Sequence, residues 1–153
     1  MKQKKILILG GSSDLGMECV KLFLNNNWEV VAHFNSRKIT SREIIRDKNF
    51  SQFKFDLKQI FKFEKFLKKK QSKLNKFDAF VNLAGYLKPT TFENFSIKDL
   101  HEHLNVNSIS SFLVIRKIIK GMEKRKWGRI INTSSIGTKF GGGINRIYIK
   151  MFM

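Results

Sequence analysis

The stretch LGGSSDLG, residues 9–16, combines glycines with small hydroxyl side chains. A glycine-rich turn that leads into a helix lets backbone N–H groups approach a ligand, with the positive end of the helix dipole behind them. Between Gly10 and Gly16 such a turn suits a pyrophosphate, and the hydroxyls of Ser12 and Ser13 can add hydrogen bonds. The general Gly-x-Gly-x-x-Gly fingerprint is not met, because Ser13 stands at its middle glycine. A tight turn that binds nothing therefore stays open as the alternative.

The stretch HFNSRK, residues 33–38, carries information about the choice of cofactor. In dinucleotide-binding folds an acid after the second strand binds the ribose 2′-hydroxyl of NAD, whereas a basic residue accepts the 2′-phosphate of NADP. Asn35 and Ser36 are neutral here, and Arg37 and Lys38 are cationic. The stretch therefore favours NADP over NAD. The alternative is that Arg37 is an ordinary loop cation in a lysine-rich chain.

A regular scaffold must position these residues, and the pattern of apolar residues predicts one. Short runs rich in Ile, Val and Phe alternate with amphipathic segments. This alternation indicates parallel strands joined by right-handed helical crossovers, hence an α/β fold with a Rossmann-like, doubly wound parallel sheet. Such sheets bind ligands beyond the carboxyl ends of their strands, where the turn at 10–16 would lie. The expected strands are 4–10, 29–34, 51–56, 77–85 and 128–135, and the expected helices are 15–28, 41–48, 58–76 and 97–125.

Length and composition bound the class of protein. The 153 residues, 42% of them hydrophobic, are expected to form a single domain, residues 1–153. The single cysteine, Cys19, excludes an internal disulfide and a cysteine-rich zinc site, and we expect it to be a small buried residue. The apolar run at residues 6–9 is too short for a signal-peptide core, and no stretch approaches the roughly 18 apolar residues of a membrane span. These features predict a cytoplasmic protein with no membrane partner.

The formal net charge of +18 invites a nucleic-acid interpretation, because cationic surfaces attract phosphate backbones. The lysines, however, are spread along a chain that is also rich in Asn, Ile and Phe, which is typical of a general composition bias. The densest stretch, residues 58–76, places Ile60, Phe63 and Leu67 at helical spacing among its lysines. A solvated helix face explains this pattern, so nucleic acid is not expected as a partner.

Five stretches in a fixed order together resemble the short-chain dehydrogenase/reductase family. They are LGGSSDLG, FDL at 55–57, VNLAG at 81–85, NVNS at 105–108 and GRIINTSS at 128–135. Against the family's opening motif, Thr-Gly-x-x-x-Gly-x-Gly, Leu9 replaces the threonine and Asp14 the middle glycine, which places a carboxylate near the expected phosphates. The resemblance implies that Asp56 bonds to the adenine ring, although a helix cap is the alternative for this residue. The cofactor-binding residues that it implies are Gly10, Ser12, Ser13, Leu15, Gly16, Asn35, Arg37, Asp56, Leu57, Asn82, Ala84 and Gly85.

The same resemblance implies a catalytic set of Asn107, Ser135 and Tyr148. In the family, the asparagine holds a relay water, the serine orients the substrate carbonyl and the tyrosine exchanges a proton, assisted by a lysine four residues later. Here Phe152 stands at that fourth position. Lys150, two residues after Tyr148, would lie on another face of a helix, about 200° away. The chain also ends at Met153, so a truncated family member with an incomplete sheet is expected.

The resemblance implies an NAD(P)-dependent oxidoreductase that transfers hydride between nicotinamide and a carbonyl or alcohol, with 3-oxoacyl thioesters as the nearest substrate class. A full-length relative would be a homo-oligomer. The alternative is a catalytically inactive nucleotide-binding fragment or interaction module. No metal site is expected, because His101 and His103 lie two residues apart on a helix and cannot face one ligand together.

Overall fold

The apolar run near the N-terminus forms β1 (Lys5–Leu9), the central strand of a five-stranded parallel sheet. The structure is a computed structural model and describes residues 2–91 and 93–135. Its strands follow one another as β2 (Glu29–Phe34), β3 (Phe50–Lys54), β4 (Ala79–Asn82) and β5 (Arg129–Asn132). Its helices are α1 (Asp14–Asn25), α2 (Arg42–Ile45), α3 (Ile60–Lys69), α4 (Gln71–Leu74), α5 (Ile97–Leu104), the π-helical turn η1 (Asn105–Ile109) and α6 (Ser110–Arg125).

The sheet has the order β3-β2-β1-β4-β5, and every pair of neighbouring strands is parallel. The chain moves outward from β1 to β3, crosses back to β4 and continues to β5, so the strand order reverses between β1 and β4. This arrangement confirms the predicted doubly wound, Rossmann-like sheet. Ligands of such a sheet bind at the carboxyl ends of the strands beside this reversal.

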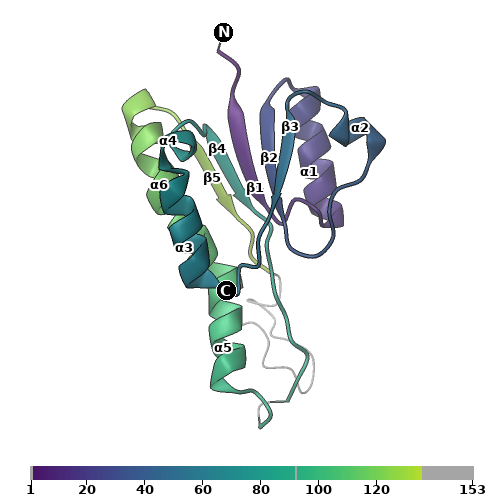
Figure 1. Cartoon of the computed structure of the whole chain (residues 1–153), viewed down its shortest axis with the longest axis vertical. Helices are drawn as coiled ribbons and strands as arrows, with labels where there is room; N and C mark the ends of the chain where they lie inside the picture. The colour runs from purple at the N-terminus through teal and green to yellow at the C-terminus, as the bar shows by residue number, and fades with distance from the viewer. Residues whose placement is uncertain (1, 92, 136–153) are drawn as a thin grey trace.

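Helices cover both faces of the sheet, as Figure 1 shows: α1 and α2 lie on one face, and α3, α4 and α6 on the other. Side chains of successive strand residues point to opposite faces. Ile6 and Ile8 of β1 accordingly join the core beside α1, whereas Leu7 and Leu9 join the core beside α3 and α6. Both faces of the central strand are therefore buried, which explains its unbroken apolar run.

The helices differ from the sequence-based prediction in two places. The expected helix at 58–76 is divided into α3 and α4, although Ile60, Phe63 and Leu67 are buried as their spacing predicted. The expected helix at 97–125 is divided into α5, η1 and α6, because a π-helical turn interrupts it. Cys19, expected to be buried, is half-buried beside the α1 core. None of the helices within the described residues has the length and apolar character that a membrane crossing requires.

Candidate functional site

The glycine turn between β1 and α1 has too little room for a Cβ at Gly10 and at Gly16. Gly10 has φ +74°, and a Cβ there would lie 2.7 Å from the backbone of Leu83 and Ala84. A Cβ on Gly16 would lie 2.3 Å from the carbonyl oxygen of Gly10. The first close approach packs the turn onto the segment after β4, and the second packs the first turn of α1 onto the glycine turn. The turn is therefore packed closely at the carboxyl ends of β1 and β4, with the tight backbone geometry that a phosphate-binding turn uses.

Ser13 organises the start of α1 as its N-cap residue. Its hydroxyl accepts a hydrogen bond from the Gly16 amide at 3.0 Å and donates one to the Gly10 carbonyl at 2.9 Å. The single hydroxyl proton is used inside the turn, where Ser13 caps α1, and its hydrogen bond to a phosphate stays a prediction. The amides of Asp14 and Leu15 belong to the first helical turn, whose N–H groups have no acceptor within the helix. Leu15 is exposed, and Ser12 is half-buried.

His33, near the end of β2, is buried next to the glycine turn and accepts hydrogen bonds from its backbone. The Gly10 amide donates to its Nδ1 at 3.2 Å, and its Nε2–H donates to the Phe55 carbonyl at 2.8 Å. The Gly11 amide bonds to the His33 carbonyl at 2.9 Å. Burial lowers the pKa of His33, which favours the neutral ring that this pattern requires. The sequence pattern did not indicate this role; the one available signal was a histidine after the apolar residues Val30, Val31 and Ala32.

Arg37 lies beside the same turn. Its Nη2 contacts the Ser12 carbonyl at 3.0 Å and the Asp14 carboxylate at 3.2 Å. The guanidinium of Arg37 thus offsets the carboxylate that departs from the family's motif. Both side chains are largely exposed, and Asn35 is exposed as well, so Arg37 remains accessible from solvent.

Asp56 follows β3 and makes local hydrogen bonds. One carboxylate oxygen accepts from the Lys58 amide at 3.0 Å, and the other accepts from the Gln59 side chain at 3.3 Å. These contacts form an Asx turn ahead of α3, whose N-cap residue is Gln59, so the side chain of Asp56 does not cap the helix. Neither contact removes all acceptor capacity from the carboxylate. Leu57 is buried in the core beside α3.

Residues 82–86 follow β4 and form one wall of a cavity of about 580 Å³. Asn82 is buried, and its Oδ1 accepts from the Ala84 amide at 3.2 Å. Its carbonyl accepts both the amide and the hydroxyl of Thr133, which follows β5. A Cβ on Gly85 would meet nothing within 4 Å. Because Gly10 packs against Leu83 and Ala84, the glycine turn and the cavity adjoin at the reversal of strand order.

Asn107 lies in the π-helical turn, and its side chain binds the backbone of Tyr86, the last residue of the 82–86 segment. Its Oδ1 accepts from the Tyr86 amide at 2.7 Å, and its Nδ2 donates to the Tyr86 carbonyl at 3.1 Å. Both residues line the cavity. Ser135 is half-buried, lies three residues beyond β5, and is not among the described residues that line the cavity. Tyr148 and Lys150 fall outside the described residues.

Beyond Tyr86 the chain is fixed to α5. The Lys88 amide donates to Nε2 of His103 at 3.2 Å, and the Lys88 ammonium pairs with Asp99 at 2.7 Å. Asp99 also accepts from the backbone and hydroxyl of Ser96, completing a capping box. The Lys88 ammonium and then the Ser96 donors hold the pKa of the Asp99 carboxyl well below its usual range. Among the described residues, no group of His, Cys, Asp and Glu is arranged to hold a metal ion.

The structure therefore brings the predicted cofactor-binding residues to one edge of the sheet, at the carboxyl ends of successive strands. Gly10 follows β1, Asn35 follows β2, Asp56 follows β3, and Asn82 ends β4. Ser135 follows β5 at the same edge. In Figure 1 this is the edge from which α5 projects.

Residues 4–149 match the family model described as short chain dehydrogenase. A curated relative, the 3-oxoacyl-[acyl-carrier-protein] reductase FabG of Chlamydia pneumoniae, is 28% identical over 144 residues, which are 90% of this chain and 57% of the relative. The NADP-bound structure of ElxO superposes with a TM-score of 0.73 at 24% identity, covering 94% of this chain and 60% of that one. A short chain dehydrogenase from Leptospira borgpetersenii with bound NAD+ gives a TM-score of 0.78 at 22% identity, covering 97% and 57%. The chain thus spans little more than half the length of these proteins.

Proposed function

Since the chain belongs to the short-chain dehydrogenase family, we propose that it serves an oxidoreductase that moves a hydride between a nicotinamide dinucleotide and a carbonyl or alcohol. The observation that carries this proposal is the glycine turn at Gly10–Gly16. It is closed to side chains at Gly10 and Gly16, lies at the reversal of strand order, and adjoins the cavity beside residues 82–86.

The chemistry of the turn fits a dinucleotide. The amides of Asp14 and Leu15, at the positive end of α1, can bind a pyrophosphate. Asp56 keeps acceptor capacity for an adenine amino group, and residues 82–85 would lie along the cofactor. When bound, the nicotinamide supplies or accepts the hydride. The solved relatives named above hold NADP or NAD+, which supports a nicotinamide cofactor here.

NADP is the cofactor we propose, on the basis of Arg37. Its guanidinium is accessible and lies beside the turn, and no acidic side chain follows β2 between residues 35 and 38. A cation at this place can accept a 2′-phosphate. The Asp14 carboxylate competes for the same guanidinium. When the cofactor binds, its 2′-phosphate would replace this carboxylate as the anionic partner of Arg37.

For the reaction itself, we assign Ser135 to orient the carbonyl, Tyr148 to exchange the proton, and Asn107 to position the site. The contacts of Asn107 with both backbone groups of Tyr86 suit a positioning residue that fixes the cavity wall.

A 3-oxoacyl thioester is the substrate class we propose, because the Chlamydia pneumoniae relative is named as a 3-oxoacyl-[acyl-carrier-protein] reductase. A cytoplasmic location, and a homo-oligomeric assembly for a full-length relative, remain part of the proposal.

A second candidate function is a nucleotide-binding module without catalysis. The observation that favours it is the residue pattern after Tyr148, where Phe152 replaces the expected lysine and Lys150 has the wrong helical spacing. Both candidates share the nucleotide site and differ in turnover alone.

Titration of the 153-residue protein with NADPH, followed by cofactor fluorescence, tests the shared part of the proposal. We expect saturable binding that Gly10→Val abolishes, because a β-branched residue fits neither φ +74° nor the close contact with Leu83 and Ala84. Leu22→Ala, on the exposed face of α1, serves as the matched control and should bind like the parent chain. Unchanged NADPH affinity in a folded Gly10→Val variant would defeat the assignment.

A further inference from the structure

The fold gathers basic residues that look scattered along the sequence. Residues 60–76, which form α3 and α4, carry seven lysines against one glutamate. Residues 110–126, which form α6 and its cap, carry six basic side chains against one glutamate. Together the two segments hold a net charge of +11 out of +18 for the chain. They pack side by side on one face of the sheet (Figure 1).

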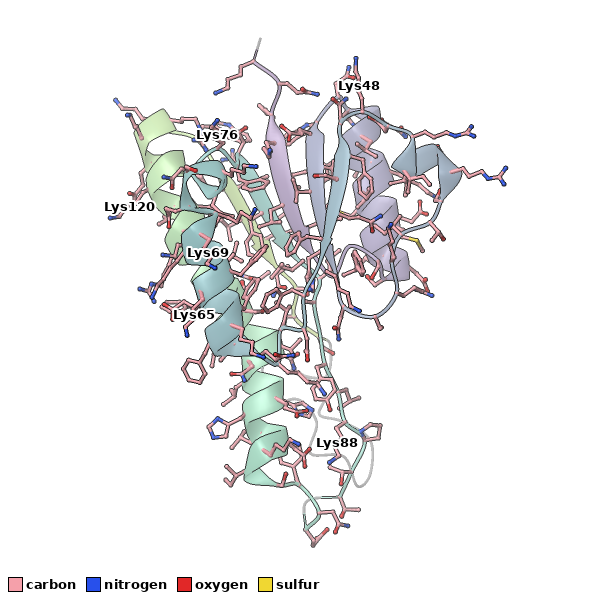
Figure 2. The ribbon with its side chains drawn as sticks, in the orientation of Figure 1. Lys48, Lys65, Lys69, Lys76, Lys88 and Lys120 are labelled. Atoms are coloured by element: carbon pink, nitrogen blue, oxygen red, sulfur yellow. The ribbon has the colours of Figure 1, made fainter. Side chains whose placement is uncertain are left out.

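The opposite helical layer is close to neutral. Residues 14–25 and 42–48, which include α1 and α2, carry four acidic and four basic side chains. A composition bias alone would load the exposed positions of both layers alike. The segregation of charge therefore creates a cationic face over α3, α4 and α6, which we call the lysine face. Figure 2 shows Lys65, Lys69, Lys76 and Lys120 on this side of the molecule and Lys48 away from it.

Few acidic partners neutralise the lysine face. Glu64 pairs with Lys68 at 3.5 Å, and the half-buried Arg125 pairs with Asp78 at 3.0 Å. Lys65, Lys69 and Lys120 are exposed. Their charges add to a field that attracts polyanions and concentrates them at this face.

An aromatic ring lies within this face. Phe61, in the first turn of α3, is 80% exposed. Residues three or four apart on a helix are neighbours, so Phe61 shares a row with Lys65, and Lys69 continues that row. A ring beside cations offers a platform on which a base can stack.

We propose that the lysine face is a docking surface for single-stranded nucleic acid, with lysines on the phosphates and Phe61 stacked on a base. Lysines act as point charges that follow a phosphate backbone without reading sequence. The pairing of a cationic strip with an exposed ring favours an unpaired strand over a duplex, whose bases are already stacked, and over an acidic polypeptide, which offers carboxylates and no bases. The proposal is independent of the cofactor site.

Fluorescence anisotropy of a labelled oligothymidine of about 20 nucleotides, titrated with the full chain, provides the test. The triple variant Lys65→Glu, Lys69→Glu, Lys120→Glu should bind at least about tenfold more weakly. Its slope of log affinity against log salt should be shallower by about 2, because each phosphate contact contributes roughly 0.7. Phe61→Ala should lose about fivefold or more through stacking alone. Arg42→Glu, Arg46→Glu, Lys48→Glu, three exposed changes of equal charge away from the lysine face, is the matched control and should retain most of the affinity.

Three outcomes would overturn the proposal. The first is no saturable binding by the parent chain at about 50 mM salt, where phosphate contacts are strong. The second is an equal loss in the two triple variants, which would assign the binding to overall charge. The third is competition by polyglutamate as effective as that of unlabelled oligothymidine, together with no effect of Phe61→Ala, which would assign the face to an acidic polypeptide. Circular dichroism of each variant verifies that it is folded.

Discussion

The Gly10 amide donates to Nδ1 of His33 across 3.2 Å, so a buried ring on β2 fixes the turn between β1 and α1. The same ring donates through Nε2 to the Phe55 carbonyl after β3. Three strand ends are thereby joined through one neutral imidazole. A protonated ring carries hydrogen on both nitrogens and has no acceptor to offer Gly10.

This relationship predicts that acid weakens both the fold and the turn. Burial lowers the pKa of His33 in the folded chain, so the unfolded chain takes up the proton first as pH falls below about 6.5. The free energy of unfolding should decline from about pH 6.5 downward, until pH reaches the folded pKa. His33→Asn can keep an acceptor near the Nδ1 position and does not titrate. Urea unfolding and NADP titration at pH 7.5 and 5.5 should show a smaller pH effect in His33→Asn than in the parent chain. Equal pH effects in both proteins would contradict the prediction.

Gly16 should be less tolerant of a methyl group than Gly85. A Cβ at Gly16 would lie 2.3 Å from the Gly10 carbonyl oxygen, whereas a Cβ at Gly85 meets nothing within 4 Å. Gly16→Ala should therefore lower the free energy of unfolding by about 1–3 kcal/mol through overpacking. Gly85→Ala should leave it within about 0.5 kcal/mol. Urea denaturation of the two variants measures the contrast, and equal stabilities would show that the turn relaxes freely.

Asp14 should limit the affinity for NADP by holding Arg37 at 3.2 Å. Asp14→Asn removes this competing anion and should strengthen NADPH binding several-fold. In the variant, Arg37 can form its charge-assisted bond to the 2′-phosphate without first losing an ion pair. Arg37→Asp should instead reverse the preference toward NAD. Parallel titrations with NADPH and NADH measure both effects. Tighter binding of NADH by the parent chain would refute the charge argument.

The ion pair of Lys88 with Asp99 should make the segment after β4 sensitive to acid. The pKa of the Asp99 carboxyl is depressed in the folded chain by Lys88 and Ser96, so its contribution is present above the unfolded pKa, about 3.9, and is lost as pH falls below it. Lys88→Met removes the ammonium, so the pKa of Asp99 is depressed less in the folded chain and the loss of stability on acidification should be smaller. Thermal unfolding of both proteins between pH 5 and pH 2 measures the two losses, and losses of equal size would contradict the prediction.

The 153-residue chain should turn over poorly even where it binds nucleotide. Phe152 stands four residues after Tyr148, at the position where the resemblance implies an assisting lysine. General acid–base assistance of this kind is worth about 10² to 10⁴ in rate. Phe152→Lys should restore little activity. Robust NADPH oxidation with a carbonyl substrate that Tyr148→Phe abolishes would overturn this expectation.

The sequence predicted the sheet well because burial on both faces leaves unbroken apolar runs, as in Ile6 and Leu7. It also predicted that the turn at 10–16 lies at the carboxyl ends of the strands, because β1 was recognisable as a buried strand of a parallel sheet. The role of His33 depends on where β2 lies relative to β1, and no local pattern encodes that distance. The separate hydrogen bonds of Ser13 and Asp56 likewise depend on turn geometry, which residue types alone leave open.

The π-helical turn at Asn105–Ile109 joins α5 and α6 into one continuous helical rod. It determines the rotation of the side chains of α5 relative to those of α6 about the helix axis. A π-turn accommodates one residue more than an α-turn, and that residue rotates the preceding side chains by about 100° relative to those that follow. Upstream, α5 presents Asp99 and His103 to the segment that contains Lys88, whereas downstream α6 presents Val114 and Ile118 to the sheet. Deletion of a single residue here would give a more regular rod and turn one of these two faces away from its partner. The length of this rod is thus constrained more tightly than its composition, and natural variants that change it should add or remove residues in numbers close to whole turns.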